Sequence, residues 1–147
     1  MAVDVVSEIT IACPRAEVAR YAADPDNAAD WYESIKSVEW ESPPPLSVGS
    51  RLAFVARFLG RRLAYTYEVV DVVPGERLVM RTAQGPFPME TTYTWHDADH
   101  GATRMTLRNR GEPAGFAKLT APAIAAAVRR ANRKDLEGLK RILERPT

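Results

Sequence analysis

The sequence predicts an α+β fold in which a curved sheet wraps around one long amphipathic helix. From residue 34 to residue 110, short runs of Val, Thr, Tyr and Phe alternate with polar residues, as in strands that bury one face. From residue 117 to residue 144, Ala, Leu, Lys, Arg and Glu predominate, and apolar residues recur at helical spacing. A helix that packs across a curved sheet tends to leave a hollow, where we expect the function to lie. The apolar stripe of this helix comprises Ile124, Val128, Ala131, Leu136, Leu139 and Ile142.

Turn signals divide the N-terminal part of the chain. Residues 3–11 are β-branched and partly alternating, which predicts a strand. Pro14 suits the first turn of a helix, and Asp24 followed by Pro25 repeats that signal because Asp can cap a helix and Pro can occupy its first position. Two short helices are therefore expected before the second strand. The expected elements are a strand at 3–11, helices at 14–21 and 25–31, and a strand at 35–41.

The middle of the chain reads as a series of hairpins. In residues 50–58, Arg51 and Arg57 share one face of the strand while the apolar residues share the other. Leu59-Gly60-Arg61 and Pro74-Gly75 are turn sequences that end strands. The remaining expected strands are 50–58, 62–72, 78–82, 89–96 and 103–109.

Pro122 lies inside the helical pattern of the C-terminal segment. Proline removes an amide donor and clashes with the preceding turn of a helix. We therefore expect a break or kink at Pro122 and a straight helix only from residue 123 to residue 144.

Composition indicates an ordinary globular protein. The length of 147 residues predicts a single domain, and 46% of the residues are hydrophobic and 27% charged. The longest apolar run, residues 121–128, is too short to span a bilayer, and the first residues lack the pattern of a secretory signal. The single cysteine, Cys13, excludes an intrachain disulfide and fits a reducing compartment. We expect a cytoplasmic monomer or weak homodimer with no stable membrane insertion.

The net charge of +1 provides no field that would attract nucleic acid, so no nucleic-acid partner is expected. Acidic side chains outnumber basic ones in residues 1–50, and the reverse holds in residues 115–147. A solvated helix face opposite an acidic edge accounts for this pattern, and a weak basic docking surface is the alternative.

Several segments, taken in order and spacing over nearly the whole chain, carry a family resemblance. They are 11–14 (IACP), Asp24-Pro25 with Trp31, 48–51 (VGSR), 67–78 (YEVVDVVPGERL), 101–107 (GATRMTL) and 135–140 (DLEGLK). With these segments the chain resembles the SRPBCC superfamily, also called START-like or birch-pollen-allergen-like, and within it the polyketide cyclase/dehydrase branch.

The resemblance implies the helix-grip fold, in which a seven-stranded antiparallel sheet curls around a C-terminal helix and encloses a cavity. Members of the superfamily include binders of lipids, sterols and plant hormones, aromatase/cyclases that act on polyketides, and activators of chaperone ATPases. They share no catalytic motif. The resemblance therefore supports a ligand cavity more strongly than a reaction.

The residue types that most often bind metals are sparse. His96 and His100 flank a turn that also contains Asp97 and Asp99, and no third ligand on a rigid neighbour is apparent. Cys13 has no histidine near it in sequence, which favours a buried structural thiol over a nucleophile. We expect no metal site and no cofactor.

Aromatic residues with polar edges share the predicted inner face of the sheet. Tyr65 and Tyr67 lie in the apolar phase of one strand, and Tyr93 and Trp95 in that of another. They could be core aromatics whose polar atoms reach backbone partners. Together, however, they supply more polar edge than a dry core usually holds, which favours a cavity for a small hydrophobic ligand. The predicted ligand-binding residues are Leu52, Phe54, Phe58, Tyr65, Tyr67, Thr91, Tyr93, Trp95, Met105, Leu107, Asn109, Phe116, Leu119, Ile124 and Val128.

Two other functions stay open. A polyketide cyclase or dehydratase would use the same cavity, with a tyrosine as acid or base. Glu68 and Glu90 fall in the outward phase of their strands, and Asn132 and Asp135 lie beside the helix stripe without forming an acid pair, so no catalytic residue is assigned.

The third possibility is a protein-interaction module that uses the basic face of the C-terminal helix. It predicts a small cavity and an exposed apolar patch beside Arg129, Arg130 and Arg133.

Overall fold

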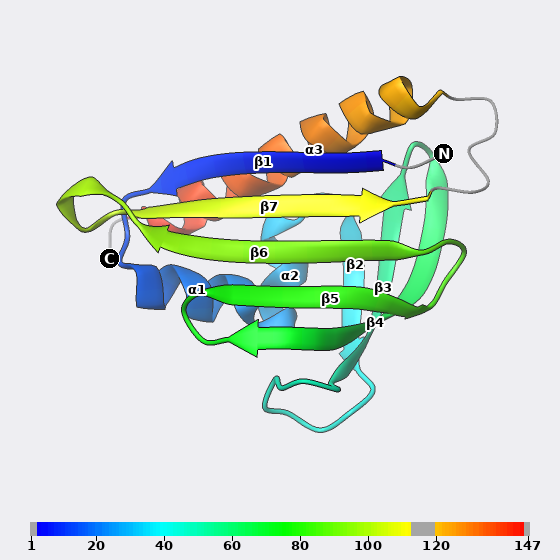
Figure 1. Ribbon diagram of the computed structural model, residues 1–147, viewed down its shortest axis with the longest axis horizontal. Coiled ribbons are helices and arrows are strands. Elements are labelled where there is room, and N and C mark those ends of the chain that lie inside the picture. The colour runs from blue at the N-terminus through cyan, green and yellow to red at the C-terminus, as the bar shows by residue number, and fades with distance from the viewer. Residues whose placement is uncertain (1–2, 113–119, 146–147) are drawn as a thin grey trace.

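A seven-stranded antiparallel sheet curls around one long helix in the computed structural model, which describes residues 3–112 and 120–145 (Figure 1). Two short helices and a 3₁₀ turn connect the first two strands, and the predicted helix-grip arrangement is confirmed. The elements are β1 (Val3–Ile11), α1 (Arg15–Ala23), η1 (Pro25–Asn27), α2 (Ala28–Trp31), β2 (Ile35–Trp40), β3 (Arg51–Phe58), β4 (Arg61–Val73), β5 (Arg77–Gln84), β6 (Met89–Asp97), η2 (Asp99–Gly101), β7 (Thr103–Gly111) and α3 (Ala121–Leu143).

The strand order is β1-β7-β6-β5-β4-β3-β2, so β1 adds to the β7 end of the meander that runs from β2 to β7. The sheet is strongly curved, and β2 and β3 run steeply across the direction of β5 to β7 in Figure 1. Helices α1, α2 and α3 lie on the concave side, where α3 contacts β1, β7 and α2. The turn between β3 and β4 has both residues at positive φ, 52° at Leu59 and 76° at Gly60, as a two-residue hairpin requires.

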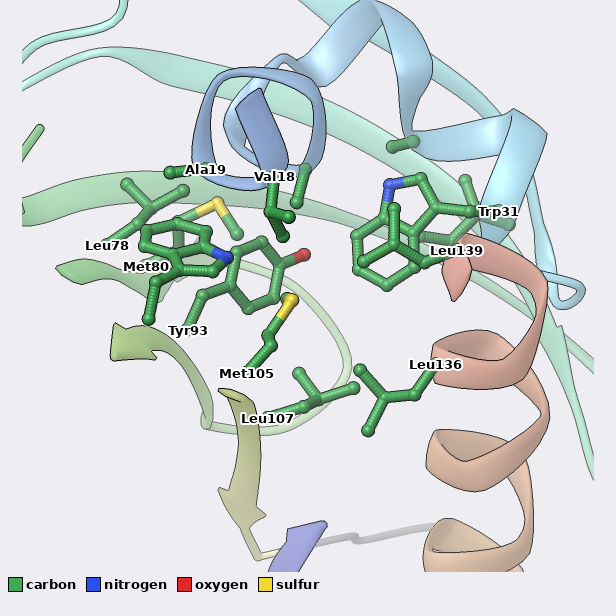
Figure 2. Close-up of a cluster of buried hydrophobic side chains, with 14 of the residues drawn as sticks. Val18, Ala19, Trp31, Leu78, Met80, Tyr93, Met105, Leu107, Leu136 and Leu139 are labelled. Carbon is green, nitrogen blue, oxygen red and sulfur yellow. The ribbon is translucent and has the colours of Figure 1, made fainter. Parts of the chain in front are cut away.

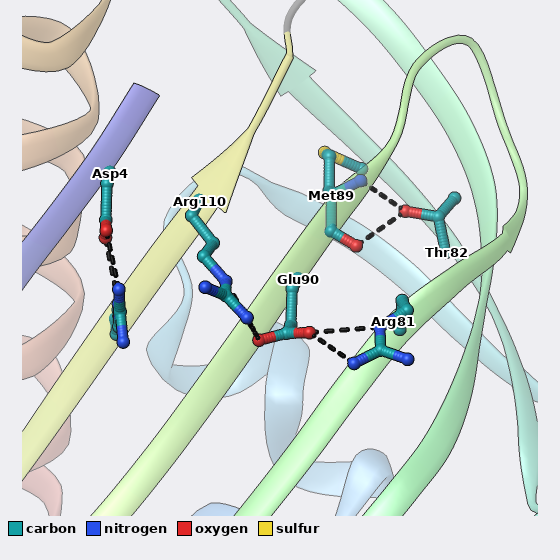
Figure 3. Close-up of polar contacts among 7 residues, drawn as sticks. Asp4, Arg81, Thr82, Met89, Glu90 and Arg110 are labelled. Atoms are coloured by element: carbon teal, nitrogen blue, oxygen red, sulfur yellow. Dashed lines mark hydrogen bonds and ion pairs between the residues drawn. The ribbon is translucent and has the colours of Figure 1, made fainter. Parts of the chain in front are cut away.

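The convex face carries a row of charges that crosses the strands. Arg51 pairs with Glu68 at 3.1 Å. Glu90 pairs with Arg81 at 2.8 Å and with Arg110 at 2.6 Å (Figure 3). These partners face each other in the strand register. Both glutamates therefore point outward, as the alternation in the sequence predicts.

The concave face is largely apolar and forms the core. Leu136 of α3 reaches toward Leu107 of β7 (Figure 2), and Met105 and Leu139 belong to the same buried cluster. These four side chains are at most 1% exposed. This part of α3 therefore closes tightly onto the sheet.

The predicted kink at Pro122 is wrong. Helix α3 begins at Ala121, and the side chain of Thr120 caps it by accepting a hydrogen bond from the Ala123 amide at 3.3 Å. Pro122 thus lies in the first turn, where its missing amide has no helical partner to lose. Residues 117–119, predicted as helix-forming, lie outside the described residues.

Strands β4, β5 and β7 extend beyond their predicted ends. Their polar terminal residues still pair with neighbouring strands, as Arg110 does with Glu90 and Gln84 with Thr66. Within the described part of the chain, no helix has the length and hydropathy to cross a membrane.

Candidate ligand-binding site

A cavity of about 150 Å³ lies between the concave face of the sheet and α3. It lies where a large hydrophobic cluster, beneath the short helices, meets a smaller one formed by Val3, Val5, Leu63, Phe87 and Ile124. The residues of α3 at this level are Ile124, Val128, Ala131, Asn132 and Asp135. The small Ala131 and the short polar side chains leave space that leucines fill farther along the helix.

Three aromatic rings form one wall of the cavity. Phe54 and Tyr65 face each other across β3 and β4, with ring centroids 5.4 Å apart and planes 2° from parallel. Tyr67 meets both rings edge-on, at 5.4 Å from Phe54 and 5.0 Å from Tyr65. Such a wall offers both faces and edges to a planar ligand.

A chain of neutral hydrogen bonds crosses the cavity from the sheet to the helix. The Tyr67 hydroxyl lies 2.8 Å from Thr91 Oγ1, which donates to Asn109 Oδ1 at 2.6 Å. Asn109 Nδ2 then donates to Asn132 Oδ1 at 2.7 Å. Since the single Thr91 proton goes to Asn109, the Tyr67 phenol must donate to Thr91. We call this series of hydrogen bonds, from Tyr67 through Thr91 and Asn109 to Asn132, the polar relay. Burial raises the pKa of Tyr67 to about 12, so the relay is uncharged at neutral pH.

A second polar pair lines the same cavity. The hydroxyl of Tyr32, directly after α2, lies 2.7 Å from that of Tyr93 on β6. Burial raises the pKa of both phenols far above the ordinary value, so both stay protonated and one donates to the other.

Asp135 is a buried carboxyl group at the site. It is 3% exposed, lines the cavity, and accepts a hydrogen bond from the Glu33 amide at 3.0 Å. Burial raises its pKa to about 7, although the Glu33 amide acts in the opposite direction. Both protonation states are therefore populated near neutral pH, which is the property of an acid–base group.

The structure brings most of the predicted site residues to this cavity. The predicted residues that line it are Phe54, Phe58, Tyr65, Tyr67, Thr91, Tyr93, Asn109, Ile124 and Val128. That they bind a ligand stays a prediction. Phe116 and Leu119 lie outside the described residues.

The placement of Leu52, Trp95, Met105 and Leu107 in the cavity wall needs correction. All four point to the concave side, as their strand phase predicts, but they pack in the larger hydrophobic cluster and are at most 2% exposed. Trp95 also lines a separate hollow of about 630 Å³ beside α1, most of whose other wall residues are exposed or half-buried.

Sequence reasoning missed several cavity residues. Tyr32 follows the predicted helix without a periodic signal, and Phe87 lies in an irregular stretch between strands. Asn132 and Asp135 were detectable as polar interruptions of the apolar stripe, because residues three apart share one face of a helix. The other missed wall residues include Ser34, Met80 and Met89.

Cys13 takes no part in the cavity. Its thiol is buried and donates to Glu17 at 3.2 Å, and burial followed by this carboxylate raises its pKa to about 11. The thiol is thus protonated and unreactive at neutral pH.

Comparison with known proteins gives the family. Residues 2–144 match the family described as polyketide cyclase/dehydrase and lipid transport. The chain belongs to this family. The predicted resemblance to the START-like superfamily is thereby confirmed. No curated protein matches the chain in sequence.

Solved structures of several superfamily members share the fold. A START superfamily protein from Mycobacterium smegmatis has a TM-score of 0.82 at 13% identity, covering 96% of this chain and 97% of that one. The Zhui aromatase/cyclase from Streptomyces sp. R1128 has a TM-score of 0.78 at 20% identity, covering 99% and 95%. Ginseng major latex-like protein 151 from Panax ginseng has a TM-score of 0.76 at 10% identity, covering 98% and 99%. At these identities the likeness concerns the fold alone.

Proposed function

We propose that this protein binds a small hydrophobic molecule, lipid-like, aromatic or polyketide-like, in the cavity between the sheet and α3. The observation that carries the proposal is the cavity itself, about 150 Å³ in volume and walled mainly by aromatic and aliphatic side chains. An engineered cavity of about this volume in another protein takes up benzene. The cavity therefore accommodates one ring.

The few polar groups in the wall support binding of a ligand with a polar end. The polar relay and the pair of Tyr32 and Tyr93 are fixed by hydrogen bonds before any ligand arrives. A preformed apolar site with few oriented polar groups is typical of small-molecule binding. For single-ring probes we expect dissociation constants of roughly 0.1–1 mM, given the few atoms they bury.

The test is native mass spectrometry of the purified protein, with extraction and identification of any retained molecule. A matched pair of variants shows whether the cavity is responsible. Ala131→Phe fills the cavity wall and is expected to remove the retained mass, whereas Ala126→Phe, on the exposed side of the same helix, is expected to keep it. Equal retention by both variants, or binding of no small hydrophobic molecule at all, would contradict the proposal.

The cyclase or dehydratase alternative is favoured by one observation, the buried and readily titrated Asp135. A reactive polyketide held against the aromatic wall could exchange a proton with this carboxyl group. If turnover occurs, Asp135→Asn is expected to abolish it while binding persists.

The interaction-module alternative finds less support. Among the described residues, the large exposed hydrophobic side chains are Val6, Val48 and Leu59. None of them lies on α3, so the predicted apolar patch beside the arginines is missing from the described surface of this helix.

A further inference from the structure

The polar relay ends in an unused donor. Asn132 is 2% exposed and lines the cavity, and its Nδ2 has no hydrogen-bond partner among the described residues. A buried amide nitrogen without a partner is unusual and costly, because it has given up its bonds to water. A ligand oxygen in the cavity would satisfy it.

The orientation of this amide follows from the rest of the relay. Tyr67 has one hydroxyl proton, and Thr91 Oγ1 is its hydrogen-bond partner. If every amide were reversed, Thr91 would donate to Tyr67, and the buried phenol would lose its acceptor. The relay therefore runs from Tyr67 to Asn132, with the Oδ1 of Asn132 occupied and its Nδ2 available.

The charges around the cavity limit what can approach this donor. Of the described residues that line the cavity, Arg110 alone is cationic, and its guanidinium pairs with Glu90 on the convex face at 2.6 Å. Asp135 lies three residues after Asn132 on the same helix and lines the same cavity. A carboxylate ligand would meet a partly ionised acid and, among the described wall residues, no unpaired cation.

We propose that the cavity selects an uncharged, ring-bearing ligand with a ketone-type carbonyl oxygen that accepts a hydrogen bond from Asn132 Nδ2. The aromatic wall of Phe54 and Tyr65 holds the ring, and the end of the relay orients the carbonyl. This inference deepens the proposed function and rests on it, because it assumes that ligands enter this cavity.

Three single-ring probes of similar size separate the effects of ring shape, carbonyl oxygen and charge on binding. Acetophenone carries the carbonyl, α-methylstyrene replaces the oxygen by a methylene group of the same shape, and benzoate carries a charge. Titrations of the wild-type protein by nuclear magnetic resonance are expected to show acetophenone binding roughly tenfold tighter than α-methylstyrene, because only the ketone pairs the buried amide. Benzoate is expected to bind most weakly. The side-chain amide resonances of Asn132 should shift with acetophenone and much less with α-methylstyrene.

The variant Asn132→Leu removes the donor with little change in volume, and it also removes the Oδ1 that accepts from Asn109 Nδ2. It is expected to weaken acetophenone binding about tenfold and to change α-methylstyrene binding less than about twofold. Glu137→Leu introduces the same side chain at an exposed position of α3 and is expected to leave the preference for acetophenone intact. If Asn132→Leu does not fold, the wild-type titrations decide the question without it.

The outcomes distinguish the two proposals. Equal wild-type affinities for acetophenone and α-methylstyrene would mean that shape alone selects the ligand, and would overturn this inference while cavity binding survives. Tighter binding of benzoate than of acetophenone would overturn this inference as well. If no probe binds, the proposed function fails together with the inference.

Discussion

The two faces of the sheet use polar residues in opposite ways, although the residues are neighbours in sequence. Tyr67, Thr91 and Asn109 form the polar relay on the concave face, and each lies next to a charged residue that points to the convex face. The convex row is ionic and partly exposed, whereas the relay is neutral and largely buried. The charged neighbours in question are Glu68, Glu90 and Arg110.

This difference has energetic consequences. An exposed ion pair contributes little because water and salt screen it, and a lost partner is replaced by solvent. A buried hydrogen bond that loses one partner leaves the other desolvated and unpaired. Substitutions on the concave face should therefore have larger effects than matched substitutions on the convex face.

The largest effect is expected from the buried carboxyl group on the concave side. Burial raises the pKa of Asp135 from 3.8 to about 7, so the folded protein holds this proton at pH values where the unfolded chain has released it. The contribution of Asp135 to stability is therefore complete below the unfolded pKa of 3.8. It is lost progressively as the pH rises from there through the folded pKa of about 7. The loss amounts to at most about 4 kcal/mol.

Asp135→Asn should remove this pH dependence, because an amide keeps an acceptor for the Glu33 amide and does not ionise. In urea unfolding at pH 4, 6 and 8, the free energy of unfolding of the variant is expected to increase relative to that of the wild type as the pH rises. Asp30→Asn, at an exposed position, serves as the control and should follow the wild type. Parallel curves for wild type and Asp135→Asn would mean that Asp135 titrates normally.

The next largest effect should come from breaking the polar relay. Thr91→Val keeps the shape of the side chain but leaves the Tyr67 hydroxyl without its acceptor and Asn109 without its donor. We expect a loss of roughly 2–3 kcal/mol in the free energy of unfolding, measured by urea denaturation. Thr92→Val, one residue along on the opposite face, should cost less than about 0.5 kcal/mol. Similar losses for the two variants would remove the distinction between the faces.

The sequence predicts the faces well because alternation along a strand depends on local geometry alone. The outward phase of Glu68 and Glu90 and the inward phase of Tyr65 and Tyr67 follow directly from period two. Pro122 was misjudged for a related reason. Its effect depends on its distance from the helix start, and Thr120 sets that start by capping.

The position of the cavity along the concave face was not predictable in the same way. Thr91 and Met105 share the concave face, yet one lines the cavity and the other is packed in the core. What separates them is the level at which α3 presents Ala131 or Leu136 to the sheet, which depends on tertiary packing. The burial of Asp135 has the same origin, since helical spacing fixes its face but not its depth.

The smallest effect, with the opposite pH dependence, is expected on the convex face at Glu90. Partial burial by itself would raise the pKa of Glu90, but hydrogen bonds from Arg81 and Arg110 outweigh it and lower the pKa below the ordinary value. Its contribution is therefore present above about pH 4.5 and is lost as the pH falls through the folded pKa. Glu90→Gln should cost about 1 kcal/mol at pH 7, and less in 1 M salt, which screens the pairs.

Glu68→Gln gives the matched comparison, because Glu68 pairs with one arginine at 3.1 Å and is more exposed. Its cost should be smaller than that of Glu90→Gln under the same conditions. Urea unfolding at low and high salt measures both. The comparison fails if Glu90→Gln lowers the free energy of unfolding more than Thr91→Val does, or if its effect does not change with salt. Either result would show that the convex ion pairs contribute as much to stability as the polar relay on the concave face. In that case burial would not be what distinguishes the two faces.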